Sequence, residues 1–150
     1  MKLAEALIQR KDIQMHISQL KTRLLANAKH QEGVAPAEDP ILLLEELSTA
    51  THELAILISK INKPNEHTTF DGRSISEILI ERDVKAKEIA IVQDFLEAAS
   101  DLTERMSRDE IVKLSSVNVS ELRKKLDAKA KVVRALDLKI QELNWTTELV

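Results

Sequence analysis

The clearest structural signal in the sequence is the stretch VSELRKKLDAKAKVVRALDLKIQEL, residues 119–143. Apolar residues recur there every seven positions in two interleaved columns. One column contains Val119, Leu126, Val133 and Ile140; the other contains Leu122, Leu136 and Leu143, with Lys129 as its polar member. A seven-residue repeat places apolar side chains along one side of an α-helix, where a second helix can cover them. The stretch therefore predicts a long helix of a helical bundle.

Three further segments carry a similar repeat, and we expect helices at about 2–28, 40–62 and 74–99 beside the one at about 119–143. The expected contact columns are Leu3, Ala6, Ile13, Ile17, Leu20 and Leu24 in the first, Leu44, Leu47, Leu54, Ile58 and Ile61 in the second, and Ile75, Ile78, Ile89, Val92, Leu96 and Ala99 in the third. At 1.5 Å per residue each helix is roughly 35–40 Å long, which favours side-by-side packing. The sequence predicts an all-α, antiparallel four-helix bundle that forms a single domain over residues 1–150.

Breaker and capping residues predict the connections between these helices. Gly33, Pro36 and Pro40 cluster in one connection, and Pro64, expected to end the second helix, lies with Gly72 in another. Ser74-Ile-Ser-Glu77 has the spacing of a capping box, and Asn118-Val-Ser-Glu121 resembles it. Residues 68–74 surround an Asp-Gly pair typical of a tight hairpin, and the β-branched residues of 111–117 suggest extended chain. We therefore expect a small β-annex from residues of about 68–74 and 111–117.

Composition excludes several classes of protein. The 150 residues include two Gly, one Trp, two Phe, no Tyr and no Cys, which argues against β-sandwiches, Gly-rich nucleotide folds, disulfides and zinc–thiolate sites. A net charge of -3 gives no general attraction to nucleic acid. The longest apolar run is five residues, 54–58, against the roughly 20 that a membrane-spanning helix needs. We expect a cytoplasmic protein that binds neither nucleic acid nor membranes.

Motifs of the common enzyme and cofactor classes are absent from the sequence. No Glu-x-x-His supports a di-iron site, and Asp12 with His16 is the one carboxylate–histidine pair at a spacing of four within a predicted helix. No Gly-x-Ser-x-Gly elbow, Walker loop or Rossmann glycine pattern occurs. The sequence therefore predicts no catalytic residue, no metal site and no cofactor.

Polar residues interrupt the apolar columns at Arg10, Asn27, Thr51, Arg82, Lys85 and Lys129. A buried charge without a partner costs several kcal/mol, so each of these charges must find a partner, reach water, or line a cavity or interface. The favoured interpretation is a structural network that sets helix register, and the alternative is a site for an anion or small ligand. The residues proposed for that site are Arg82, Asp83, Asn62, Asn65, Asn144 and Trp145. Trp145 is expected after the last helix, as a plug over the bundle end or as an anchor to another subunit.

Several helices carry more apolar surface than one contact column uses. Leu43, Ala50, Ile56 and Leu57 widen the second helix, and Ile80, Val84, Ile91 and Phe95 form a separate line on the third. These surfaces favour self-association, with cover by long loops as the alternative. Residues 30–59 contain six acids and no Lys or Arg, whereas residues 121–139 contain seven bases and three acids. These two segments could meet within a subunit, meet between subunits, or remain solvated.

Four stretches resemble a family of small, uncharacterised bacterial proteins, some of which carry the label septicolysin. They are LLANAKHQEGVAPAEDP (24–40), ISKINKPNEHT (58–68), DGRSISEILIERD (71–83) and IQELNWTTEL (140–149). The resemblance implies an all-helical subunit that forms a ring-like homo-oligomer, with a hexamer as the expected size. The septicolysin label implies a pore-forming or haemolytic activity as the alternative function. An enzyme or ligand carrier with its site at a subunit interface is the third possibility.

Overall fold

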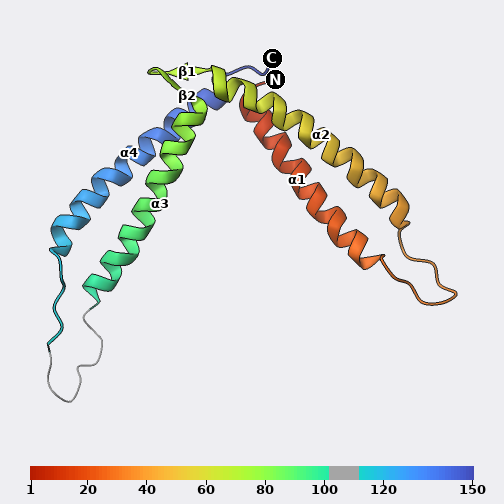
Figure 1. Cartoon of the computed structure of the whole chain (residues 1–150), viewed down its shortest axis with the longest axis horizontal. Coiled ribbons are helices and arrows are strands. Elements are labelled where there is room, and N and C mark those ends of the chain that lie inside the picture. Colours follow the sequence, from red (N-terminus) through yellow and green to blue (C-terminus); the bar gives the residue numbers. More distant parts are fainter. Residues whose placement is uncertain (102–111) are drawn as a thin grey trace. The chain divides into compact units, whose positions relative to one another are not determined.

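The computed structural model describes residues 1–101 and 112–150, and it contains four long helices and a two-stranded sheet (Figure 1). In chain order the elements are α1 (Leu3–Ala26), α2 (Pro40–His67), β1 (Thr69–Phe70), β2 (Arg73–Ser74), α3 (Ile75–Ser100) and α4 (Val119–Thr146). The predicted all-α class and the four helices are confirmed. No helix of the described residues is both long enough and apolar enough to cross a membrane.

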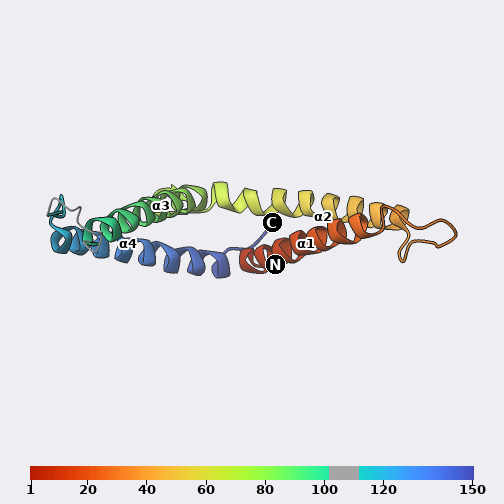
Figure 2. The ribbon, with the colours of Figure 1, turned by 90° about the horizontal axis from the view of Figure 1, so that it is seen from below.

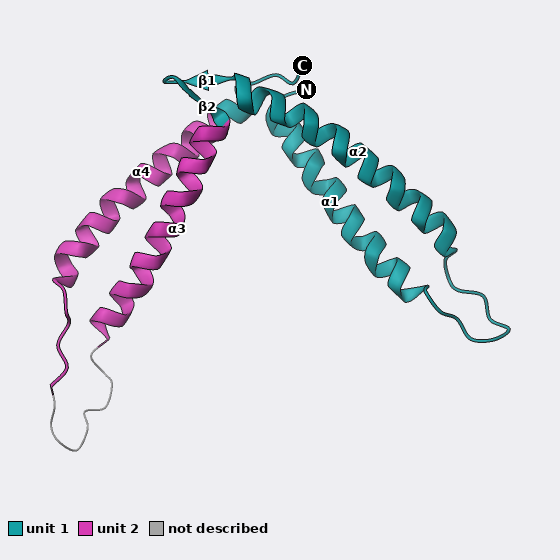
Figure 3. Ribbon diagram, in the orientation of Figure 1, with its two compact units in different colours: residues 1–75, 143–150 teal, residues 76–142 magenta. Residues whose placement is uncertain are grey.

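The chain divides into two compact units, coloured separately in Figure 3. Unit 1 comprises Met1–Ile75 and Leu143–Val150, which contain α1, α2, the hairpin and the end of α4. Unit 2 comprises Ser76–Glu142, which contain most of α3 and α4. That residues 1–150 form a single domain stays a prediction.

In unit 1, α1 and α2 lie side by side and run in opposite directions (Figures 1 and 2). Their shared core contains Leu20, Leu43 and Ala50, and the half-buried Ile17, Leu24 and Leu47 pack around these three side chains. At the start of α1, Leu3 and Ala6 are completely buried. The apolar column predicted for the first helix is therefore the surface that α1 buries.

The buried column of α2 differs by one position from the predicted one. Leu43, Ala50 and Leu57 are buried, whereas Leu44 and Thr51 are exposed. Leu47, Leu54 and Ile61 fit either column. Their periodicity therefore could not decide whether the column with Leu43 or the one with Leu44 is buried. Thr51 therefore interrupts no core contact, and its hydroxyl donates a hydrogen bond to the carbonyl of Leu47 over 3.0 Å.

Pro64 does not end the second helix, which continues to His67. Pro64 continues the column of Leu57 and Ile61 and is itself buried, so packing offsets the missing backbone donor. The carbonyl of Pro64 accepts the N–H of Thr68 over 2.8 Å and completes the last turn. The prediction that α2 ends near residue 62 was therefore wrong by more than one turn.

The hairpin predicted at Asp71-Gly72 is present. Thr69 pairs with Ser74 and Phe70 with Arg73, in antiparallel register. Asp71 and Gly72 have φ values of 52° and 74°, and two positive φ values in a two-residue loop are typical of a type I′ turn. The sheet contains these two strands only among the described residues.

The second half of the predicted β-annex is absent. Residues 112–117 form no strand, and Ile111 lies outside the described residues. Val112 and Leu114 are exposed, and Ser115 donates its hydroxyl to the carbonyl of Val117 over 3.1 Å. A strand needs a partner for its backbone groups, and β-branched residues alone do not supply one.

Capping residues fix the beginnings of two helices, and one of the two caps, Asn118, was predicted from the sequence. Asp39 precedes Pro40 and accepts the N–H of Ile41 over 2.9 Å, which satisfies one of the free donors at the start of α2. Asn118 accepts the N–H of Glu121 over 3.1 Å and caps α4 in the same way. The third helix begins directly after Ser74.

Unit 2 buries one face of each of its helices. Ile78 and Leu96 on α3 and Leu126, Val133 and Ile140 on α4 are buried, in agreement with the predicted columns. The separate line on α3 remains exposed: Ile80 at 63%, Val84 at 63%, Ile91 at 61% and Phe95 at 47%. The described loops therefore leave this second apolar face of α3 uncovered.

Candidate functional site

Arg82, one of the site candidates from the sequence, joins α3 to α4. Its Nε donates to Oδ1 of Asp137 over 2.7 Å, and its Nη1 donates to Oδ1 of Asp83 over 3.2 Å. The hydrogen bond to Asp137, and then the one to Asp83, raise the pKa of Arg82 above its ordinary value. Because two carboxylates already engage this guanidinium, its charge is balanced within unit 2.

Lys129 and Lys85 also have acidic partners in unit 2. The ammonium of Lys129 lies 2.6 Å from Oε1 of Glu88, and that hydrogen bond is the main reason that the pKa of Glu88 is lowered. Lys85 contacts Glu81 one turn earlier on α3, over 2.9 Å. As the α3 partner moves from Arg82 to Glu88, the α4 partner moves back from Asp137 to Lys129. These two bridges therefore fix an antiparallel register for α3 and α4.

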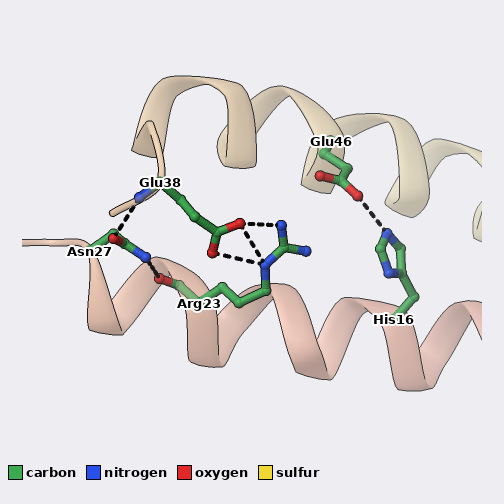
Figure 4. Close-up of polar contacts among 5 residues, drawn as sticks. All are labelled: His16, Arg23, Asn27, Glu38 and Glu46. Carbon is green, nitrogen blue, oxygen red and sulfur yellow. Dashed lines mark hydrogen bonds and ion pairs between the residues drawn. The ribbon is translucent and has the colours of Figure 1, made fainter. Parts of the chain in front are cut away.

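A second polar network joins the C-terminal end of α1 to the N-terminal end of α2, around Asn27 (Figure 4). Asn27 is only 7% exposed, and its amide nitrogen donates to the carbonyl of Arg23 over 2.8 Å. Its amide oxygen accepts the N–H of Glu38 over 3.0 Å. The side chain thus bonds the end of α1 to the residue just before the cap of α2.

Arg23 and Glu38 add an ion pair beside Asn27, and Figure 4 shows the two side chains pointing toward each other. The Nε of Arg23 lies 3.0 Å from Oε2 of Glu38, and its Nη2 bonds to Oε1. This contact raises the pKa of Arg23 and lowers the pKa of Glu38 from their ordinary values. Further along the same helices, Nε2 of His16 lies 3.1 Å from Oε1 of Glu46.

Sequence reasoning identified Asn27 but missed two pairs of side chains that join the same helices. These pairs are Arg23 with Glu38 and His16 with Glu46. A usable signal was present in their spacing. His16 and Arg23 lie seven residues apart on α1, and Glu38 and Glu46 lie eight apart across the start of α2. On two antiparallel helices, such similar spacings bring basic and acidic side chains to the same levels.

The remaining site candidates belong to the other unit of the chain, and a site that joins them to Arg82 stays a prediction. Asn62 is exposed, Asn65 and Asn144 are half-buried, and all three belong to unit 1, whereas Arg82 and Asp83 belong to unit 2. Trp145 lies inside α4 rather than after it, and 54% of its surface is exposed. Its role as an anchor to another subunit stays a prediction.

The described residues contain neither a metal cluster nor an unsatisfied polar interior. No group of three His, Asp or Glu side chains gathers within the described chain as a metal site would require. In the same residues, every buried side-chain nitrogen and oxygen has a hydrogen-bond partner. Unit 1 has an open groove of about 420 Å³, where Gln9 and Ile13 on α1 face Glu53 and Lys60 on α2.

A family of unknown function, DUF6847, matches residues 10–149 of the sequence. The chain belongs to this family. Its fold is similar to the crystal structure of a functionally unknown conserved protein from Corynebacterium diphtheriae. The two are 40% identical, the match covers 100% of this chain and 99% of the other, and the TM-score is 0.94. No curated protein matches the chain. That the chain belongs to an uncharacterised protein family is therefore confirmed, and neither match mentions septicolysin.

Proposed function

We propose that this protein acts as a cytoplasmic homo-oligomer, in which self-association of the helical subunits is the molecular function. The hexamer implied by the septicolysin-like resemblance is the proposed size. A second copy of the same chain is the proposed partner, without nucleic acid, cofactor or metal.

One observation carries this proposal: the line of exposed apolar side chains on α3. Ile80, Val84, Ile91 and Phe95 are each about half exposed or more, and they follow one another along a single face. Folded monomers rarely leave contiguous apolar surface of this kind in water, because its exposure to solvent is unfavourable. Further exposed apolar side chains lie at the start of α2, at Ile41, Leu42 and Leu44.

The polar residues that interrupt the apolar columns also favour a structural role over a ligand site. Arg82, Lys85 and Lys129 bind carboxylates of their own chain, and Asn27 bonds to backbone groups. A site for an anion would need a cation or N–H donor free to receive it. The favoured interpretation of these residues is therefore a network that sets the helix register.

Size-exclusion chromatography with multi-angle light scattering tests the proposal. At micromolar concentration we expect a species several times heavier than the 16.9 kDa chain, and six times heavier if it is the hexamer. A monodisperse species at the mass of one chain would overturn the proposal.

The same sample tests the pore-forming alternative. If assembly is the function, liposomes loaded with a fluorescent dye stay intact at neutral and acidic pH when the protein is added. Release of the dye would instead favour a septicolysin-like activity.

A further inference from the structure

The exposed line on α3 has a symmetric spacing. Its members follow one another at intervals of four, seven and four residues, from Ile80 to Phe95. Ile80 and Phe95 lie equally far from the point midway between Lys87 and Glu88, and so do Val84 and Ile91. The line therefore has the same spacing in both directions along the helix. A surface of this kind can match a rotated copy of itself, as a two-fold contact requires.

We propose that α3 pairs with α3 of a second copy, antiparallel, across a two-fold axis that passes near Lys87 and Glu88. Ile80 of each copy then lies at the level of Phe95 in the other, and Val84 at the level of Ile91. This inference rests on the proposed self-association and specifies the surface that performs it.

The opposite side of α3 is already occupied within the subunit. Ile78 and Leu96 are almost completely buried, and Arg82 and Glu88 bond to α4. Since Ile78 and Leu96 are buried and Arg82 and Glu88 bond to α4, the line from Ile80 to Phe95 is the exposed apolar face that α3 can present to a partner.

The area of this face fits a dimer contact. The exposed part of each of the four side chains offers about 100 Å² of apolar surface, or about 400 Å² per copy. Interfaces are about 56–65% apolar, so a patch with this apolar area corresponds to about 600–700 Å² per copy and about 1,200–1,400 Å² in total. Specific, stable interfaces begin at about 1,200 Å². A second α3 of the same shape therefore supplies enough area for a specific contact.

The charged residues near the proposed axis, Lys87 and Glu88, are compatible with this contact. Glu88 is already neutralised by Lys129 of its own chain. Lys87 is exposed, and a lysine can cover apolar surface with its methylene stem while its ammonium stays in water. The two charged residues at the midpoint thus need no new ion pair to form the contact.

A single charge on the line tests the surface. We expect Ile91→Asp to weaken self-association at least tenfold, measured by sedimentation velocity over a concentration series, because the axis places two carboxylates on one apolar contact. Ala90→Asp is the matched control, because it adds the same charge to the same helix at an exposed position that points about 100° away from Ile91. Both positions are on the surface, so folding is expected to survive, as circular dichroism would verify.

Engineered cysteines test the two-fold axis, because the chain has no cysteine of its own. We expect a mixture of Ile80→Cys and Phe95→Cys chains to form a cross-linked dimer with a short bismaleimide. Ile80→Cys alone should not cross-link to itself, because the two Ile80 positions lie roughly 22 Å apart along the paired helices at 1.5 Å per residue.

Three results separate the two proposals. Efficient cross-linking of Ile80→Cys to itself would overturn the antiparallel axis. An Ile91→Asp chain that assembles like the wild type would overturn the α3 contact while self-association stands. A wild-type chain that is monomeric would overturn the proposed function itself.

Discussion

The amide of Asn27 connects two backbone groups that belong to different elements. It donates to the carbonyl of Arg23 in the last turn of α1 and accepts the N–H of Glu38 just before α2. The side chains of Arg23 and Glu38 then meet in an ion pair, so the same two residues are linked both by backbone and by side-chain contacts. This double link holds the connection at residues 27–39 against the end of the helix pair.

Replacing Asn27 with Ala should destabilise the protein by about 1–3 kcal/mol, because the Glu38 N–H loses its partner and the Arg23 carbonyl keeps only the backbone N–H of residue 27. Urea unfolding followed by circular dichroism measures this change. Asn62→Ala is the matched control, since Asn62 is exposed, and its effect should stay within about 0.5 kcal/mol. Equal midpoints for the two variants would show that the Asn27 bonds contribute nothing to stability.

The ion pair between Arg23 and Glu38 should make stability depend on acidic pH. The hydrogen bond from Arg23 holds the pKa of Glu38 below its ordinary value in the folded chain. As the pH falls, the unfolded chain therefore binds the proton first. The stabilising contribution is complete above the ordinary pKa of about 4.3 and decreases as the pH falls through the lower, folded pKa.

Carboxyl chemical shifts from an NMR titration should place the Glu38 midpoint below that of a model peptide. In an Arg23→Gln chain the midpoint should move up toward the ordinary value, and the acid-side loss of stability should become smaller. A Glu38 midpoint that is the same in both chains would contradict the ion pair in solution.

At the level of elements, periodicity predicted which segments are helical, and packing decided which column each helix buries. On α1 and α4 a single column dominates, and α3 buries the predicted column rather than its second apolar line, so the predicted and buried residues agree. On α2 the sequence Ile41-Leu-Leu-Leu44 allows two columns, and the small Ala50 lies in the column that packs against Leu20. The continuation of that column to Pro64 also explains why α2 extends past the predicted end.

The hairpin between α2 and α3 supplies a prediction at this scale. Gly72 has a φ of 74°, and no atom lies within 4 Å of the place that a Cβ would occupy, so Gly72→Ala meets backbone strain without a clash. We expect a loss of about 1–2 kcal/mol in urea unfolding, the cost of a left-handed conformation for an L-residue with a Cβ. Asp71→Asn is the control, because Asn tolerates positive φ, and it should change stability by less than about 0.5 kcal/mol. A Gly72→Ala chain as stable as this control would show that the turn relaxes to another type.

Ion pairs were the part of the candidate site that the sequence could not assign. The sequence placed Arg82, Lys85 and Lys129 in apolar columns, which required partners for them, but the identity of Asp137 and Glu88 depends on the register of α3 against α4. A shift of one turn would bring other acids within reach of the same cations. Register is a property of the packed pair, so no single helix contains it.

At the scale of the whole molecule, charged groups remain that no partner within the described chain engages. In residues 30–59, Glu38 and Glu46 contact α1 and Asp39 caps α2, which leaves Glu32, Glu45 and Glu53. On α4 the unengaged bases are Arg123, Lys124, Lys125, Lys131 and Arg134. Opposite charges of this kind on two surfaces of one chain can meet when two copies approach each other.

Salt should therefore separate the two contributions to assembly. Between about 0.1 M and about 1 M salt the Debye length falls from about 10 Å to about 3 Å, which screens exposed charges but leaves apolar contacts intact. If the acids of α2 meet the bases of α4 in another copy, the mass from light scattering should decrease over this range and level off at the species that the α3 contact holds together. A Glu45→Lys, Glu53→Lys chain should show the smaller mass already at low salt, because each substitution turns an attraction into a repulsion. A mass that stays constant for both chains at every salt concentration would mean that these charges face water and that apolar surface alone drives the assembly.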